Sequence, residues 1–173
     1  MSRPDNIILV GHSYGGTVIT GVMDELPERI AYVFFLDAFV PDDGMSHIEA
    51  ARNAAFDPDD PMPGLPIVDG QVFLPWMDLE TYEDTPYPKD VPQSLRSLIQ
   101  PVSFTNEQAL RLPVTYVAFG TEELRENGSG IHPANRQRAR ERGWDVQLFV
   151  SDHNPQDSQP EALVELLLSE LGD

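Results

Sequence analysis

The chain has 173 residues, of which 40% are hydrophobic, and this is enough for one domain with a buried core. Its 29 acidic and 11 basic residues give a net charge of −18, which argues against nucleic acid and anionic membranes as partners. Without cysteine there is no disulfide or cysteine metal site, and without a long apolar run or a signal-peptide core at residues 1–5 we expect a cytoplasmic protein.

The first predicted element is a strand over about residues 6–10, which runs straight into the sequence Gly-His-Ser-Tyr-Gly-Gly at residues 11–16. Apolar residues then recur at helical spacing. A strand that turns directly into a helix needs small residues at the corner, and we expect Gly11 and Gly15 to meet that need. The pattern predicts a nucleophile elbow, a sharp turn that exposes the hydroxyl group of Ser13.

Three further strands are predicted over residues 30–36, 114–119 and 146–150. The run at 30–36 is apolar throughout, as in a central parallel strand whose two faces are both covered, and Asp37 follows its end. Strand, helix and strand in succession favour a right-handed parallel crossover. The sequence therefore predicts an α/β fold with a mostly parallel sheet of about four strands and flanking helices.

Two helices are predicted in the last third of the chain. The first covers about residues 133–142 and carries arginines at steps of two, which predicts a solvated helix. The second begins at Ser158, whose spacing to Glu161 fits a capping box, and continues to Leu171.

Residues 41–113 differ in character, because prolines and acidic clusters replace long regular patterns. We interpret this segment as a partly helical cap inserted into a core formed by residues 1–40 and 114–173. Within the cap we expect a helix at 46–55, a hairpin at 67–74 that turns at Asp-Gly, and a helix at 91–99. Among its apolar side chains we predict three that line a substrate pocket, with a plain lid core as the alternative: Phe73, Trp76 and Met77.

Strand ends carry the predicted chemistry. Ser13 follows the first strand, Glu122 the third and His153 the fourth, and the carboxyl ends of parallel strands meet at one edge of a sheet. A neutral His153 could take the Ser13 proton, and a carboxylate would hold the imidazole ring. Asp37 and Glu123 also follow strand ends, so both remain open as the acid, with Asp37 the main alternative to Glu122.

Three stretches carry a family resemblance: residues 11–16, Pro-Glu-Arg-Ile at 27–30 and Leu-Asp-Ala-Phe-Val-Pro-Asp-Asp-Gly at 36–44. Together they resemble the α/β-hydrolase group that includes plant methylesterases, hydroxynitrile lyases and bacterial EstC-type esterases. The resemblance implies carboxylester hydrolysis with Ser13 as nucleophile and His153 as base. It places the acid at Glu122, where the family more often has aspartate.

The chain also departs from this group, whose members have about four strands before the elbow. The family's second oxyanion donor comes from a loop in that region, so Tyr14 N–H is the remaining predicted donor and we expect weak activity. An apolar strand at residues 6–10 without an earlier neighbour predicts either a homodimer through this edge, an N-terminal partner segment, or a fragment of a longer protein.

The sequence thus predicts a serine carboxylesterase that acts on small carboxylic esters through an acyl-enzyme, without a cofactor or metal. His12 joins the three cap residues as a predicted substrate-binding residue. Two alternatives stay open: a hydroxynitrile lyase-like enzyme, and a truncated protein of low activity that binds a ligand without catalysis.

Overall fold

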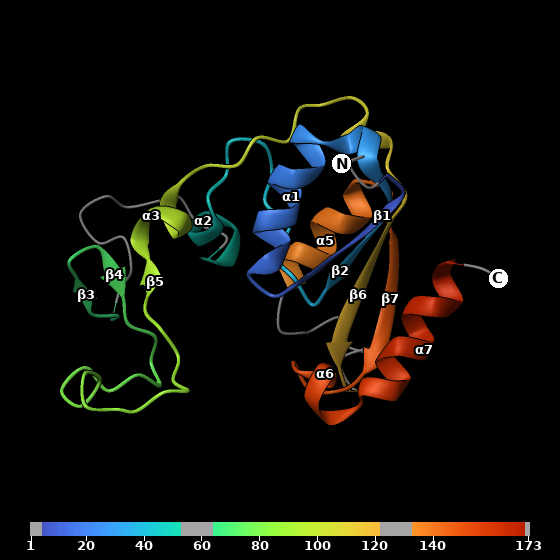
Figure 1. Ribbon diagram of the computed structural model, residues 1–173. Coiled ribbons are helices and arrows are strands. Elements are labelled where there is room, and N and C mark those ends of the chain that lie inside the picture. The colour runs from blue at the N-terminus through green and yellow to red at the C-terminus, as the bar shows by residue number, and fades with distance from the viewer. Residues whose placement is uncertain (1–4, 53–63, 122–132, 172–173) are drawn as a thin grey trace.

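A four-stranded parallel sheet forms the centre of the computed structural model, which describes residues 5–52, 64–121 and 133–171 (Figure 1). In spatial order its strands are β1 (Ile7–His12), β2 (Ile30–Leu36), β6 (Val114–Gly120) and β7 (Asp145–Val150). All four predicted strands are confirmed, with ends that differ by one or two residues, and the predicted α/β class is confirmed. Continuous apolar runs, flanked by turn residues, made these strands recognisable.

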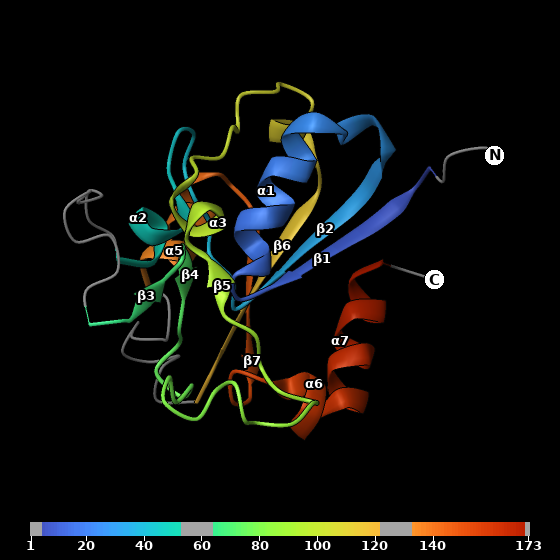
Figure 2. The ribbon, with the colours of Figure 1, turned by 60° about the vertical axis from the view of Figure 1, so that its left-hand side comes forward.

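Helices cover both faces of the sheet, as Figures 1 and 2 show from two directions. On one face α1 (Gly15–Glu25) and α5 (Pro133–Glu141) pack on Val33, Phe35 and Tyr116. On the other face α7 (Pro160–Leu171) packs on the alternate positions, including Phe34 and Val117. Because successive strand residues point to opposite faces, the apolar runs of β2 and β6 supply two separate cores.

The strands end in two level pairs, β1 with β2 and β6 with β7, and the second pair continues three residues farther. His12 pairs with Leu36 and Leu36 with Val117, while Gly120, the last residue of β6, pairs with Val150, the last residue of β7. The residues that follow the four strands are therefore gathered along one edge of the sheet, as predicted.

The cap contains short elements only. They are α2 (His47–Arg52), the antiparallel strands β3 (Ile67–Val68), β4 (Gln71–Val72) and β5 (Gln93–Ser94), and α3 (Leu95–Ile99). The predicted hairpin is confirmed, and it turns at Asp69 and Gly70, which both have positive φ as a tight hairpin turn requires. The helix predicted at 91–99 was too long, since Gln93 and Ser94 pair with β4 and the helix begins only at Leu95.

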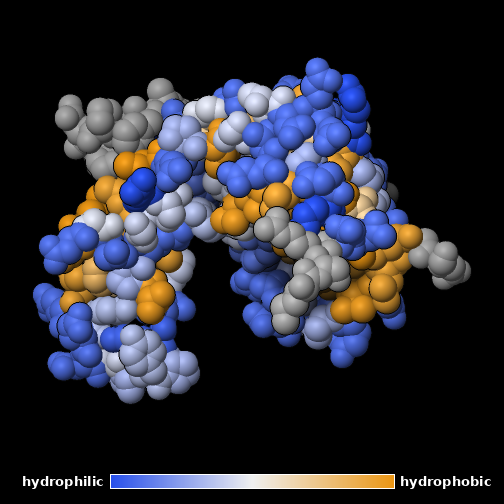
Figure 3. Space-filling view, turned by 45° about the horizontal axis from the view of Figure 1, so that its top comes forward, coloured by the Kyte–Doolittle hydropathy of each residue, from blue (hydrophilic) through white to orange (hydrophobic). Residues whose placement is uncertain are grey.

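A small core of Ile48, Val72 and Leu98 holds the cap together. Figure 3 shows a hollow in the molecular surface between the outer end of the cap and the sheet domain. Phe104 and Ala109, in the last part of the predicted cap segment, pack in the core under α1 instead. The division at residues 41–113 stays a prediction. Two short 3-10 helices, η1 (Pro27–Arg29) and η2 (Ala109–Arg111), lead into β2 and β6.

The capping box predicted at Ser158 was wrong. Ser158 is the last residue of a short helix, α6 (Pro155–Ser158), and α7 begins at Pro160 after Gln159, whose φ of −144° and ψ of 50° are not helical. Proline at the first position of each helix sets these starts instead. A capping box does occur in the cap, where the Glu49 carboxylate accepts hydrogen bonds from Ser46 N–H at 2.8 Å and Ser46 Oγ–H at 2.7 Å, just before α2.

Candidate active site

Ser13 lies at the corner between β1 and α1, with a positive φ of 53°. A non-glycine residue with this backbone conformation is strained, and such residues occur preferentially at functional sites. Two hydrogen bonds hold the corner against the end of β2: Ser13 N–H donates to Leu36 O at 3.2 Å, and Phe39 N–H donates to Ser13 O at 3.1 Å. The local geometry is that of a nucleophile elbow.

Close packing at the corner falls on Gly11 and Gly16. A Cβ atom at Gly11 would lie 2.7 Å from Ile19 Cδ1 and 2.9 Å from Gly15 O, and one at Gly16 would lie 2.2 Å from Phe39 O. The expectation for Gly15 was wrong, because a Cβ atom there would meet nothing within 4 Å. It is Gly16, the second residue of α1, that lies against the chain leaving β2.

Among the described residues, Asp37 places its carboxylate against His153. The Nδ1 atom of His153 lies 2.7 Å from Asp37 Oδ2, and the Asp37 side chain is 2% exposed. Because a carboxylate accepts, Nδ1 of the neutral ring carries the proton and Nε2 is left as the basic nitrogen. Glu122 and Glu123, the other predicted acids, lie outside the described residues.

Asp37 is itself held in an unusual conformation. Its φ is 42°, so β1 and β2 are each followed directly by a strained, non-glycine residue, Ser13 and Asp37. The Asp37 N–H donates to Val117 O at 2.7 Å, and the buried Tyr116 hydroxyl donates to Ala38 O at 3.2 Å. Burial raises the pKa of Tyr116, which keeps this hydroxyl a neutral donor.

His12 packs against His153 rather than standing apart from it. Its Nε2 atom lies 2.7 Å from the backbone carbonyl oxygen of His153, and the two ring centroids are 4.5 Å apart. Phe119 lies on a further side of the ring, at 6.2 Å between centroids. Burial lowers the pKa of His12, and this outweighs the opposing effect of the hydrogen bond to His153 O.

Tyr14, the predicted oxyanion residue, occupies the N-cap position of α1. No acceptor among the described residues takes its backbone N–H, which therefore remains available at the positive end of the helix dipole. Its side chain turns toward the cap, where the hydroxyl donates to Ser97 O at 3.2 Å and the ring contacts His47 at 4.8 Å. Tyr14 thus joins the elbow to the cap.

His47 provides a second join between cap and elbow. Its Nδ1 atom lies 3.1 Å from Thr17 Oγ1 on α1, and its ring also contacts Phe39 at 4.4 Å. The elbow, the chain after β2 and α2 therefore share one packed contact region.

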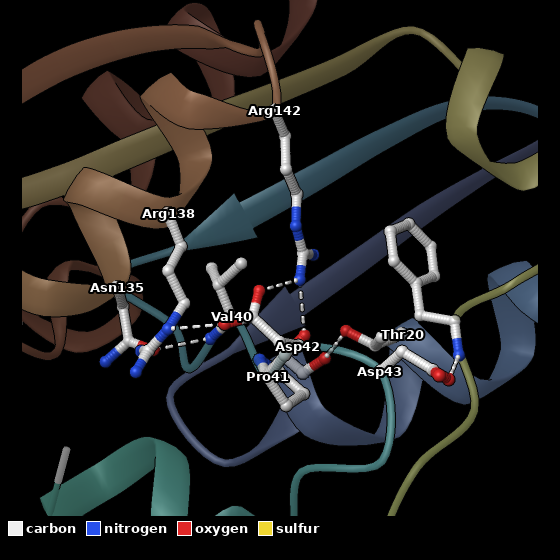
Figure 4. Close-up of polar contacts among 10 residues, drawn as sticks. Thr20, Val40, Pro41, Asp42, Asp43, Asn135, Arg138 and Arg142 are labelled. Carbon is white, nitrogen blue, oxygen red and sulfur yellow. Dashed lines mark hydrogen bonds and ion pairs between the residues drawn. The ribbon is translucent and has the colours of Figure 1, made fainter.

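Helix α5 fixes the chain that follows Asp37, as Figure 4 shows. Val40 N–H donates to Asn135 Oδ1 at 2.7 Å, Arg138 Nε donates to Asp42 at 3.2 Å, and Arg142 donates to Asp42 at 3.0 Å. The prediction of a solvated helix was wrong for this face, since the Arg138 and Arg142 side chains are only 9% and 15% exposed. Asp42, distant in sequence, makes their burial possible.

The predicted pocket residues of the cap lie in its outer part. Phe73 is buried against Tyr82, with ring centroids 5.2 Å apart, whereas Trp76 is 67% exposed and donates to Asp90 at 2.8 Å. Trp76 and Met77 line a cavity of about 220 Å³ whose walls all come from residues 76–90. The structure thus brings Ser13, His12, Asp37 and His153 to one sheet edge and forms this cavity from a separate cap segment. A substrate-binding role for Phe73, Trp76, Met77 and His12 stays a prediction.

Two features are absent from the described residues. No three His, Cys, Asp or Glu side chains within them converge in a way that could hold a metal ion. None of the helices in the described ranges is long and apolar enough to cross a membrane.

Comparison with known proteins agrees with the fold. The model of the alpha/beta hydrolase family matches residues 2–166. The chain belongs to this family. The resemblance inferred from the elbow and from residues 36–44 is thereby confirmed.

Relatives within the alpha/beta hydrolase family carry esterase names. A carbendazim hydrolyzing esterase from Nocardioides sp. (strain SG-4G) is 60% identical over 42 residues, which are 24% of this chain and 17% of that protein. Methylesterase 1 from Arabidopsis thaliana is 45% identical over 42 residues, 24% of this chain and 16% of its own length. These matches thus span less than a fifth of the curated relatives.

Among solved structures, a pyrethroid hydrolase from Sphingobium faniae JZ-2 superposes with a TM-score of 0.61 at 20% identity. The superposition covers 97% of this chain and 71% of that one. At this level of identity the likeness shows the shared alpha/beta hydrolase fold.

Proposed function

We propose that the protein is a serine carboxylesterase that hydrolyses small carboxylic esters through an acyl-enzyme intermediate. The observation that supports this most is the 2.7 Å contact between His153 Nδ1 and Asp37, at the sheet edge where Ser13 occupies a strained elbow. The esterase names of the relatives favour ester hydrolysis over the lyase-like alternative.

In the proposed reaction Asp37 accepts the Nδ1–H of His153, and Nε2 of the ring removes the proton from Ser13 Oγ. The oxygen attacks the ester carbonyl carbon, whose π electrons move onto the carbonyl oxygen. Asp37 stabilises the imidazolium that forms, and its buried position makes that stabilisation stronger than it would be in water.

The tetrahedral oxyanion then needs donors. The backbone N–H of Tyr14 and the N-terminal end of α1 supply partial positive charge at this point. Collapse of the intermediate breaks the bond to the alcohol oxygen, which takes the proton from His153. Water repeats the sequence on the acyl-enzyme and releases the carboxylic acid, so that Ser13 and His153 return to their first states.

Covalent labelling tests the proposal. A fluorophosphonate probe should modify the protein once, and peptide mass analysis should place the label on Ser13. Ser13→Ala should abolish both labelling and p-nitrophenyl acetate turnover, whereas Ser169→Ala, on the outer part of α7, should leave both unchanged.

Other results would decide for the remaining alternatives. Turnover that survives Ser13→Ala would overturn the serine mechanism. A folded protein with neither labelling nor turnover would favour the non-catalytic ligand-binding alternative. The measured kcat tests the expected weak activity.

A further inference from the structure

We infer that His12 is a positioning residue that holds the backbone of His153 in place through its imidazole Nε2–H. The inference rests on the proposed function, because it assigns His12 a role in aligning the proposed base. It differs from the substrate-binding role predicted for His12 from the sequence.

The place of His12 in the sheet is the first step. His12 ends β1 and His153 follows β7, and these are the two outer strands of the described sheet, with β2 and β6 between them. The contact joins residues 141 positions apart. Because the two strands share no backbone pairing, this side chain connects the elbow strand directly to the chain that carries the base.

Hydrogen-bond chemistry fixes the state of the His12 ring. A backbone carbonyl only accepts, so the 2.7 Å contact to His153 O requires a proton on His12 Nε2. That nitrogen is then committed and cannot also donate to a substrate. Asp37 holds the ring of His153, and His12 holds its main chain. With one hydrogen bond alone the residue could still rotate about that contact, whereas two hydrogen bonds fix its orientation.

The charge of His12 matters as much as its proton. Among the described residues, the ionisable groups that face it are His153 and Asp37, and Phe119 of β6 covers another side. His153 must become positive during the reaction, and a second positive ring 4.5 Å away would oppose this. Burial favours the neutral form of His12, so it can donate its hydrogen bond without adding a competing charge.

Two variants separate positioning from other roles. His12→Gln keeps an N–H donor of similar reach and no charge, whereas His12→Leu keeps the bulk and removes the donor. With p-nitrophenyl acetate we expect the leucine variant to lose roughly tenfold in kcat, as one hydrogen bond of average strength gives, with KM unchanged. The glutamine variant should stay within about threefold of the parent in kcat.

A second readout does not need turnover. The proton shared by His153 Nδ1 and Asp37 should give a far-downfield proton NMR signal, absent in Asp37→Asn. We expect this signal to persist in His12→Gln and to broaden or vanish in His12→Leu. If the parent protein proves inactive, the esterase proposal fails while the NMR comparison still tests the role of His12.

Several results would overturn the inference. They are a leucine variant with parental kcat and an intact downfield signal, a glutamine variant as damaged as the leucine one, or a change confined to KM, which would favour substrate binding. Should the leucine variant not fold, His12→Asn replaces it. The asparagine side chain is polar but too short for its N–H to reach His153 O, so we expect the same losses as for His12→Leu.

Discussion

Asp37 Oδ2 and His153 Nδ1 lie 2.7 Å apart although 116 positions separate the two residues. Asp37→Asn should therefore lower kcat by about 10⁴-fold, because an amide favours the wrong ring tautomer and cannot stabilise the imidazolium. Glu122→Gln is the matched variant, since Glu122 is the rival acid, and its kcat should stay within about threefold of the parent. Steady-state kinetics with p-nitrophenyl acetate measures both, and a collapse in Glu122→Gln alone would assign the acid to Glu122.

Gly16→Ala should destabilise the protein by about 3 kcal/mol, since its Cβ atom would lie 2.2 Å from the backbone oxygen of Phe39. Gly21→Ala on the same helix meets nothing within 4 Å and should stabilise it by about 0.5 to 1 kcal/mol. Urea denaturation followed by circular dichroism gives both values. Equal effects of the two substitutions would contradict the close approach of α1 to the chain after β2.

Asn135→Ala removes the acceptor of the Val40 N–H and should lower the free energy of unfolding by about 2 kcal/mol, because a buried donor loses its partner. Gln137→Ala, on the exposed side of the same helix, should change it by less than about 0.5 kcal/mol. Thermal unfolding checks the pair. We also expect Asn135→Ala to lower kcat, because Val40, which Asn135 holds, lies only three residues after Asp37.

The pH dependence of stability should contain a contribution from His12. Its pKa is lowered in the folded protein relative to the ordinary value of 6.5, so the unfolded chain binds the proton more readily. The unfolding free energy contributed by neutral His12 is thus fully present well above 6.5 and is lost as the pH falls through and below that value. Denaturant titrations over this range should show a shallower decline for His12→Gln than for the parent, and parallel curves would refute the assignment.

Strand β1 pairs only with β2 within the described residues, and Ile8 and Val10 are 46% and 45% exposed. We propose that a second copy of the chain pairs with this edge. Light scattering should then show a dimer that Ile8→Lys converts to a monomer. The control is Val68→Lys on the cap hairpin, where Val68 is similarly exposed, at 42%, and this variant should leave the dimer intact. A parent protein that is monomeric at all concentrations would refute the homodimer.

Much of the sheet could be predicted because its information is local. Short stretches of sequence are enough to predict the strands at 30–36 and 114–119 and the Gly-rich corner at Ser13. The acid could not be chosen in this way, since carboxylates follow two strands and the contact of Asp37 with His153 joins residues 116 positions apart.

The burial of the arginines at α5 could not be predicted either, because it depends on contacts between residues far apart in the sequence. Arg138 and Arg142 look solvated in sequence, and only their pairing with Asp42, which lies 96 and 100 positions away, accounts for their burial. The start of β5 at Gln93 depends likewise on a partner strand, which a helical pattern cannot reveal.

The proposed acid follows an interior strand and the proposed base follows an edge strand, and this difference has a consequence for heat inactivation. Asp37 follows the interior strand β2, whereas His153 follows β7, which in the described sheet is bonded to β6 alone and is half-exposed along most of its length. Fraying of this edge strand would displace the proton acceptor while the carboxylate at the end of β2 keeps its place. Catalysis should accordingly fail several degrees before the core melts.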